Sequence, residues 1–202
     1  MIAAVHRALL LVVSAPSGAG KTTLCHRLMT EFPSIRYSIS CTTRAPRAGE
    51  RDGHDYHFLS ERDFEVRRAA GEFLEYACVH DHWYGTLRQP VREALAAGGD
   101  VIMDIDVQGA ATLRAGIRER LDDPLHDAYV DVFIAPPSLD SLRDRLQARG
   151  QDAPDVIARR LKNAENEMAR WREYRYLVVN DQLDAAYDQL RAIVLAERCR
   201  VF

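Results

Sequence analysis

The sequence lacks both the cysteine spacing of a zinc site and that of a disulfide framework. Its four cysteines, at positions 25, 41, 78 and 199, lie far apart, and no two of them form a C-x-x-C pair. It also lacks a long hydrophobic run, since residues 8–13 are far too few to span a bilayer. That run leads into a glycine-containing loop, so we expect a buried strand and not a signal peptide. These absences predict a cytosolic chain without a membrane partner.

Neither sign of charge dominates the chain. There are 27 Lys and Arg residues against 30 Asp and Glu residues, which gives a formal net charge of -3. This balance argues against a protein that binds nucleic acid through bulk electrostatics. The hydrophobic fraction of 47% and the charged fraction of 28% over 202 residues are typical of one globular domain with a substantial core.

Short apolar segments alternate with helical ones along most of the chain. Buried strands are expected at residues 9–14, 101–105, 130–135 and 176–180, because each is a run of apolar and β-branched residues. Helices are expected at 21–32, 108–121, 138–149 and 184–200. This order predicts an α/β fold, a parallel sheet flanked by helices, with ligands bound at the carboxyl ends of the strands.

Two polar regions interrupt this alternation. Residues 34–88 have only short strand candidates, at 35–41, 56–59, 73–79 and 83–87, with a helix near 60–70. We interpret them as an inserted, mostly antiparallel lobe. Residues 149–154 separate two arginine-rich helices and have the composition of a mobile lid. We therefore expect a single domain with a core at 1–33, 89–137 and 174–202, a lobe at 34–88 and a lid region at 138–173.

A phosphate-binding loop is predicted between the first strand and the first helix. The segment A-P-S-G-A-G-K-T at 15–22 matches the P-loop pattern G-x-x-x-x-G-K-[ST], except that Ala15 replaces the first glycine. Backbone N–H groups of such a loop and the helix N-terminus attract phosphates. The alternative is an ordinary turn with an incidental lysine. The flanking strand and helix favour an ATP site made by Ala15, Pro16, Ser17, Gly18, Ala19, Gly20, Lys21, Thr22 and Thr23.

Two acidic residues end the second buried strand, at Asp104 and Asp106. In P-loop proteins an acidic residue at this place holds Mg²⁺, often through water, and the threonine after the P-loop lysine is a direct ligand. We therefore predict Mg²⁺ as cofactor, with Thr22 and Asp104 as its site. For Asp106 an equally good interpretation is a helix N-cap.

The loop at 40–50, S-C-T-T-R-A-P-R-A-G-E, has two arginines around a proline. Arginine pairs suit a bidentate grip on a phosphate, although most arginine-rich loops are simply solvated. Further segments in order are D-Y at 55–56, F-L-E-Y at 73–76, Y-G-T at 84–86, D-I-D-V-Q-G at 104–109, R-G at 149–150, R-R-L at 159–161 and V-N-D at 179–181. Together these segments resemble the guanylate kinase family over nearly the whole chain.

The resemblance implies an enzyme that transfers the γ-phosphoryl group of ATP to GMP, so that its partners are these two nucleotides. It implies a lobe that binds GMP, in which Glu75 accepts the guanine donors while Ser40 and Thr86 contact O6. The GMP phosphate would be held by Arg44, Arg47, Tyr56 and Tyr84. The remaining residues that the resemblance assigns to the GMP site are Glu50, Asp104 and Asp106.

The resemblance also implies a catalytic group without a strong base, because phosphoryl transfer needs alignment and charge neutralisation. Its members are Lys21, Arg44, Arg145, Arg149 and Arg160. For Arg145 an ion pair with Asp144 or Glu165 is the alternative. Asn180 would touch adenine, unless it only ends a strand.

Two alternative functions would share part of these sequence features. A phosphorylated ribose as acceptor would leave Glu75, Ser40 and Thr86 without a base to recognise. A peptide-binding domain of the scaffold-protein type would not need an intact phosphate loop. The sequence predicts neither the oligomeric state nor whether dGMP is accepted.

Overall fold

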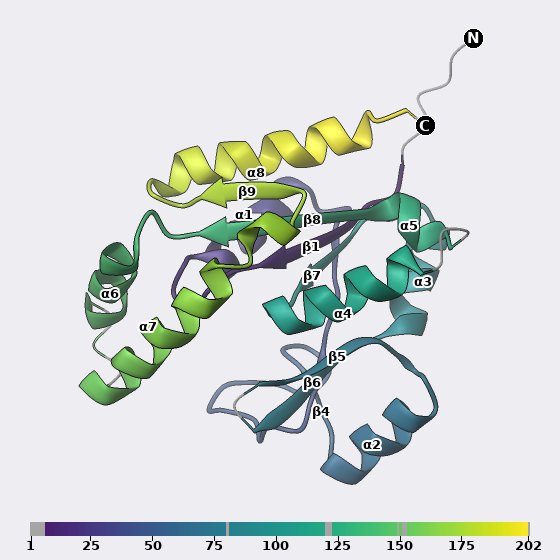
Figure 1. Ribbon diagram of the computed structural model, residues 1–202. Coiled ribbons are helices and arrows are strands. Elements are labelled where there is room, and N and C mark those ends of the chain that lie inside the picture. Colours follow the sequence, from purple (N-terminus) through teal and green to yellow (C-terminus); the bar gives the residue numbers. More distant parts are fainter. Residues whose placement is uncertain (1–6, 80, 120–122, 149, 151–152, 202) are drawn as a thin grey trace.

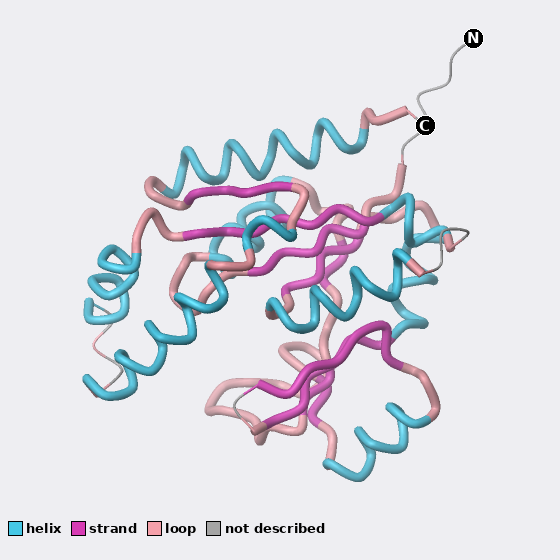
Figure 2. The backbone as a smooth tube through the Cα atoms, viewed as in Figure 1, coloured by secondary structure: helices cyan, strands magenta, loops and turns pink. Residues whose placement is uncertain are grey.

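The chain folds around two sheets, as a computed structural model shows (Figure 1). The structure describes residues 7–79, 81–119, 123–148, 150 and 153–201. The larger sheet has five strands and the smaller has four (Figure 2). Within the described part, no helix is long and apolar enough to cross a membrane.

The five-stranded sheet is parallel throughout and runs in the order β2-β7-β1-β8-β9. Its strands are β1 (Leu10–Ser14), β2 (Arg36–Tyr37), β7 (Val101–Asp104), β8 (Tyr129–Ala135) and β9 (Tyr176–Val179). Every residue of β1 and β8 is buried. Continuous apolar runs suit such strands because helices cover both faces of the sheet. The predicted α/β fold with a parallel sheet is confirmed.

Side chains of β1 alternate between two hydrophobic clusters. Leu11 and Val13 point to one face, where they meet α1 (Lys21–Glu31) and α8 (Leu183–Arg198). Leu10 and Val12 point to the other face, toward α3 (Arg88–Ala96), α4 (Val107–Arg118) and α5 (Pro124–Ala128). This alternation is the two-residue period of a strand, and the phosphate loop that follows packs Ala15 and Ala19 into the first cluster.

The smaller sheet has the order β4-β3-β6-β5 and lies beside the carboxyl end of β7 (Figure 1). Its strands are β3 (Cys41–Thr42), β4 (His57–Phe58), β5 (Phe73–Val79) and β6 (His82–Leu87). Two of its three pairings are antiparallel, and β3 pairs with β4 in parallel. Helix α2 (Glu61–Ala69) covers it by packing Phe64 on Phe73, with ring centroids 4.4 Å apart.

Two helices, α6 (Leu139–Ala148) and α7 (Pro154–Met168), stand apart from the large sheet on the side of the phosphate loop (Figure 1). They pack on one another through a small cluster that includes Leu142, Leu146 and Ile157. The 3-10 helix η1 (Trp171–Glu173) connects α7 to β9.

Three expectations about elements need correction. The strand expected at 35–41 is divided: β2 joins the parallel sheet beside β7, and β3 joins the smaller sheet. Helices α3 and α5 were not predicted from the sequence. Helix α3 has Pro90 within its first turn, where a missing N–H leaves no hydrogen bond unmade. The other elements match to within about three residues, as is usual for helix ends.

Candidate active site

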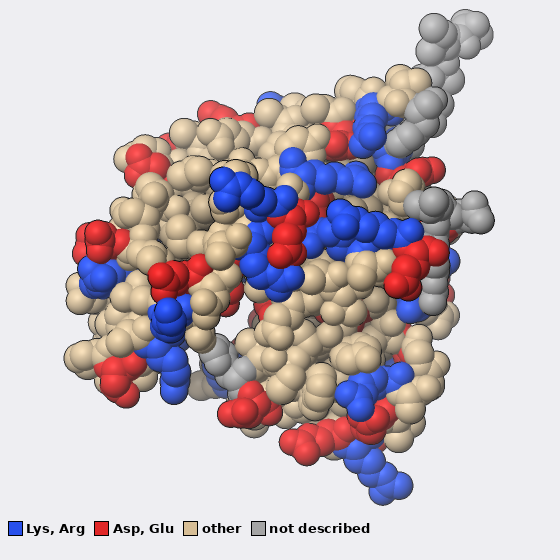
Figure 3. Space-filling view, in the orientation of Figure 1, with Lys and Arg blue, Asp and Glu red and all other residues tan. Residues whose placement is uncertain are grey.

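A cavity of about 480 Å³ lies between the phosphate loop, the smaller sheet and the end of α7. The space-filling view is hollowed between α7 and the smaller sheet (Figure 3). Most of the residues predicted for the two nucleotides line it. The lining is Ala15, Pro16, Ser17, Gly18, Gly20, Lys21, Thr22, Thr23, Ser40, Arg44, Arg47, Glu50, Tyr56, Glu75, Val79, Tyr84, Asp104, Ile105, Asp106 and Glu167.

The phosphate loop takes the shape that its glycines allow. Gly18 and Gly20 have φ values of 95° and 94°, in the left-handed region. A Cβ atom at Gly20 would overlap the side-chain amide of Asn180. Among the described residues other than glycine, only Asp81 has a positive φ. Alanine at position 15 is therefore tolerated because the backbone there needs no left-handed conformation.

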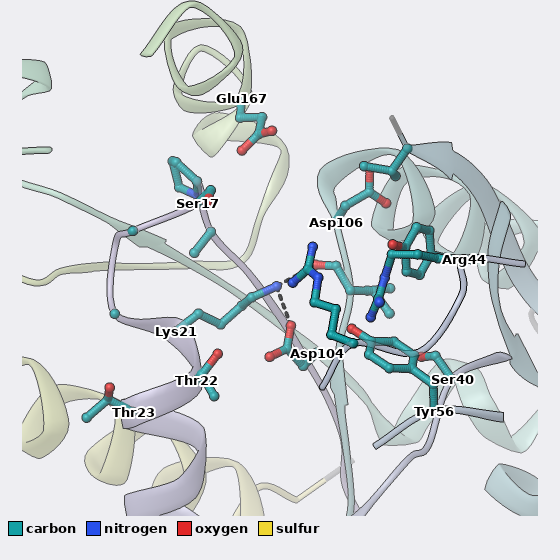
Figure 4. Close-up of a pocket in the computed structure, with 18 of the residues that line it drawn as sticks. Ser17, Lys21, Thr22, Thr23, Ser40, Arg44, Tyr56, Asp104, Asp106 and Glu167 are labelled. Atoms are coloured by element: carbon teal, nitrogen blue, oxygen red, sulfur yellow. Dashed lines mark hydrogen bonds and ion pairs between the residues drawn. The ribbon is translucent and has the colours of Figure 1, made fainter. Parts of the chain in front are cut away.

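Lys21 points from the start of α1 toward the end of β7 (Figure 4). Its ammonium forms an ion pair with Asp104 and donates to the carbonyl oxygen of Ile105 at 3.4 Å. Burial lowers the pKa of Lys21, but the Asp104 carboxylate outweighs this effect and the pKa is raised. The lysine is therefore cationic in the absence of a nucleotide, and Asp104 provides its counter-charge.

Asp106 caps a helix and also lines the cavity. Its Oδ1 accepts from the backbone N–H of Gly109 at 2.9 Å and so caps helix α4. The same residue lines the cavity, next to Asp104 and across from Glu167 (Figure 4).

Glu75 lies at the other end of the cavity, on β5, with only 4% of its surface exposed. The hydroxyl of Thr86 donates to its Oε1 at 2.7 Å. Burial raises the pKa of Glu75 to about 7, with the Asp106 charge acting in the same direction and the Thr86 hydrogen bonds opposing it. Ser40 lines the cavity, while Thr86 is buried and does not line it. This end of the cavity therefore offers oxygen atoms to a ligand rich in N–H donors.

The predicted cationic loop is held together by Glu50. Arg44 donates to both carboxylate oxygens of Glu50, at 2.8 and 3.0 Å, and the backbone N–H of Arg47 donates to Oε2 at 2.7 Å. This pairing raises the pKa of Arg44 and lowers that of Glu50. Arg44 also lies over the ring of Tyr56 at 5.5 Å, and Tyr56 meets Tyr84 edge-on. Both phenols and both arginines face the cavity.

Neither of the two predicted lid arginines that the structure describes lines this cavity. Arg145 donates to the carbonyl oxygens of Asn180 and Asp181, at 2.7 and 3.2 Å, in place of the ion pair with Asp144 or Glu165. Arg160 is on α7 and does not line the cavity, and Arg149 is outside the described residues.

Asn180 braces the phosphate loop. Its side-chain amide donates to the carbonyl oxygen of Ala19 at 2.7 Å, and only 5% of its surface is exposed. Neither Asn180 nor Ala19 lines the cavity, so Asn180 acts on the loop from behind.

Three lining residues were not predicted from the sequence: Val79, Ile105 and Glu167. Glu167 lies seven residues after Arg160, but on a polar helix this spacing does not distinguish it from a solvated residue. Seven residues are two helical turns, so the two side chains share one face of α7.

Comparisons with known proteins identify the family of the chain. The family model described as guanylate kinase matches residues 7–197. The guanylate kinase of Chelativorans sp. (strain BNC1) is 47% identical over 96% of this chain and 86% of its own length. That of Symbiobacterium thermophilum is also 47% identical, over 96% and 88%. The crystal structure of guanylate kinase from Anaplasma phagocytophilum has a TM-score of 0.76 at 29% identity, covering 98% of this chain and 89% of that one. The chain belongs to the guanylate kinase family.

Proposed function

We propose that this cavity is where the enzyme, an ATP:GMP phosphotransferase, joins its two nucleotides, with ATP on the phosphate loop and GMP on the smaller sheet. The observation that carries the proposal is the polarity of the cavity. Cationic and N–H groups of the loop lie at one end, and the buried Glu75 carboxylate lies at the other. The two ends match a polyphosphate and a donor-rich base.

The ATP phosphates would bind the backbone N–H groups of residues 18–22 at the N-terminus of α1. Lys21 would exchange Asp104 for the β- and γ-phosphates, since the phosphates carry more negative charge than one carboxylate. Asn180 would keep the loop in shape through its hydrogen bond to Ala19.

Mg²⁺ fits the oxygen donors that face the cavity. Thr22 and Asp104 present a hydroxyl and a carboxylate to the same space, and hard oxygen donors are the ligands that Mg²⁺ prefers. Thr22 would hold the ion directly and Asp104 through water. When bound, the ion neutralises charge on the phosphate oxygens.

GMP would be recognised at both of its ends. Ionised Glu75 would accept from N1–H and from the exocyclic amine of guanine, while the hydroxyl of Ser40 would donate to O6. The hydroxyl of Thr86 would contact O6 only by turning away from Glu75, to which it donates in the structure. Adenine would present an unprotonated N1 to the carboxylate and leave it unpaired. A site of this kind discriminates by roughly 10⁴-fold or more.

The GMP phosphate would be held by Arg44, Arg47, Tyr56 and Tyr84. Glu50 keeps Arg44 in place by its two hydrogen bonds. We therefore assign Glu50 a positioning role within the GMP site.

In the transfer step, an oxygen of the GMP phosphate attacks the γ-phosphorus of ATP and the bond to the ADP oxygen breaks. No strong base is required, because the attacking oxygen is already anionic. Lys21 and the lid arginines Arg145, Arg149 and Arg160 would neutralise the charge on the moving group, with Arg44 on the acceptor side.

Closure of the lid region 138–173 and the lobe 34–88 on the core would bring these groups together and exclude water. Arg145 would then leave the carbonyl oxygens that it contacts in the absence of nucleotide. Scattering profiles with and without both nucleotides should differ; superimposable profiles would contradict closure. The cytosolic location also stays a prediction.

A coupled assay for ADP formation tests the site. It offers GMP, AMP, UMP and a ribose phosphate to the wild-type enzyme and to the Lys21→Ala and Glu75→Gln variants, with Mg²⁺ and ATP. We expect turnover on GMP, its loss in the Lys21 variant, and weaker guanine selectivity in the Glu75 variant. A Lys21→Ala enzyme with normal turnover would refute the assignment of the ATP site.

A further inference from the structure

Glu167 is an acidic side chain that faces the cavity without a partner. It comes from the last turn of α7 and points into the space between the phosphate loop and Asp106 (Figure 4). Among the described residues, its carboxylate accepts no hydrogen bond and forms no ion pair. Burial and the charge of Asp106 raise its pKa to about 7, against the effect of Lys21. A half-buried carboxylate of this kind gains from a ligand that brings a donor.

Asp106 links Glu167 to Glu75, the glutamate that we assign to the guanine base. Asp106 lies close to Glu75, since a Cβ atom at Gly109 would meet Glu75 Oε2 and would lie 3.2 Å from Asp106 Oδ1. The Asp106 charge acts on the pKa of both glutamates. Asp106 and Glu75 are therefore neighbours in the cavity, and Glu167 faces the same cavity from α7.

The donors of GMP restrict what Glu167 can bind. If GMP binds as proposed above, its N1–H and exocyclic amine are taken by Glu75, and its phosphate has only acceptors and would be repelled. The ribose hydroxyls are the donors that remain, and covalent structure puts the ribose next to the base. Carboxylates are regular partners of ribose hydroxyls in other nucleotide-binding folds.

Asp106 is less suited to this contact than Glu167. Its Oδ1 already accepts from Gly109, and its Oδ2 accepts from Gln108 at 3.3 Å. We propose that Glu167 accepts a hydrogen bond from a ribose hydroxyl of the acceptor nucleotide and thereby makes the enzyme prefer GMP to the deoxynucleotide that lacks this hydroxyl. Glu167 is then a specificity residue supplied by the lid helix.

The test compares GMP, 2′-deoxy-GMP and 3′-deoxy-GMP as acceptors, by steady-state kinetics and by calorimetric binding. The variants are Glu167→Ala and Glu167→Gln. The control is Glu165→Gln on the same helix, which is exposed and pairs with Lys162 at 2.9 Å. Wild-type enzyme should prefer GMP over one of the deoxynucleotides by about tenfold, the effect of one hydrogen bond to a charged group.

Glu167→Ala should raise the KM for GMP by about tenfold and leave the KM for that deoxynucleotide unchanged. Glu167→Gln should have a smaller effect, since its amide oxygen still accepts, and kcat should change little. Equal weakening of all three acceptors, or a loss of kcat on all of them, would overturn the proposal and indicate a partner within the lid. A changed preference between ATP and its deoxy forms would overturn it as well.

Failure of this inference can be told apart from failure of the proposed site. Glu75→Gln is measured in the same series. If it keeps full guanine selectivity, the GMP site itself is misassigned. If it loses selectivity while the Glu167 variants treat all three acceptors alike, only the role of Glu167 is refuted.

Discussion

Replacing Glu75 by glutamine should stabilise the nucleotide-free protein while it weakens guanine selection. Glu75 is 4% exposed, and burial raises its pKa from 4.5 to about 7. A carboxyl group with a raised pKa in the folded state makes ionisation costly. This cost is absent below pH 4.5, grows as pH rises, and is fully present above pH 7.

The magnitude follows from the difference between the two pKa values. Each pH unit corresponds to about 1.4 kcal/mol, so ionised Glu75 costs about 3 kcal/mol at pH 8. Glutamine keeps an oxygen for the hydroxyl of Thr86, which donates to Glu75 Oε1 at 2.7 Å. For a chain of this size the gain is roughly 6 to 12 °C in Tm.

Urea denaturation of wild type and Glu75→Gln at pH 5 and pH 8 measures this effect. Glu93→Gln on α3, at an exposed position, is the control and should change little at either pH. The stability gain of Glu75→Gln should be small at pH 5 and large at pH 8. An equal gain at both values would refute the reasoning, because it would not arise from ionisation.

Three further outcomes are expected. Affinity for GMP should fall about fivefold between pH 7 and pH 6, because the ionised fraction of Glu75 falls from about one half to about one tenth. The Glu75→Gln variant should retain only the weaker dependence that comes from titration of the GMP phosphate itself, and equal slopes for both proteins would contradict this. Gly109→Ala should lower GMP affinity by about tenfold or more, because the added Cβ atom would meet Glu75. The control Gly116→Ala, on the same helix, has no atom within 4 Å of its Cβ and should stabilise the protein by about 0.5–1 kcal/mol with normal GMP binding. Asn180→Ala should lower the free energy of unfolding by about 1–3 kcal/mol and raise the KM for ATP, because the carbonyl oxygen of Ala19 loses its hydrogen-bond donor. An unchanged KM would mean that the phosphate loop keeps its shape without Asn180.

The sequence predicts those features of the fold that local patterns determine. The strands at 9–14 and 130–135 are clear because burial on both faces leaves an unbroken apolar run. The segment 35–41 is ambiguous because β2 and β3, two residues each, pair with strands far away in sequence. No local pattern says that one short stretch serves two sheets.

The same limit applies to the site. The phosphate loop is predictable because its groups lie within eight consecutive residues. Its brace by Asn180 joins residues 161 positions apart and has no local signature. Glu167 lines the cavity only because α7 returns to the phosphate loop, and a glutamate on a polar helix looks like any solvated residue.

The alternation of β1 between the two hydrophobic clusters makes the length of this strand more constrained than its composition. Leu11 and Val13 belong to one cluster and Leu10 and Val12 to the other. Exchange of one aliphatic residue for another changes only local packing. Deletion of a single residue would turn every following side chain to the opposite face and draw the loop back by about 3.3 Å. In evolution, this strand can therefore accept substitutions far more easily than insertions or deletions.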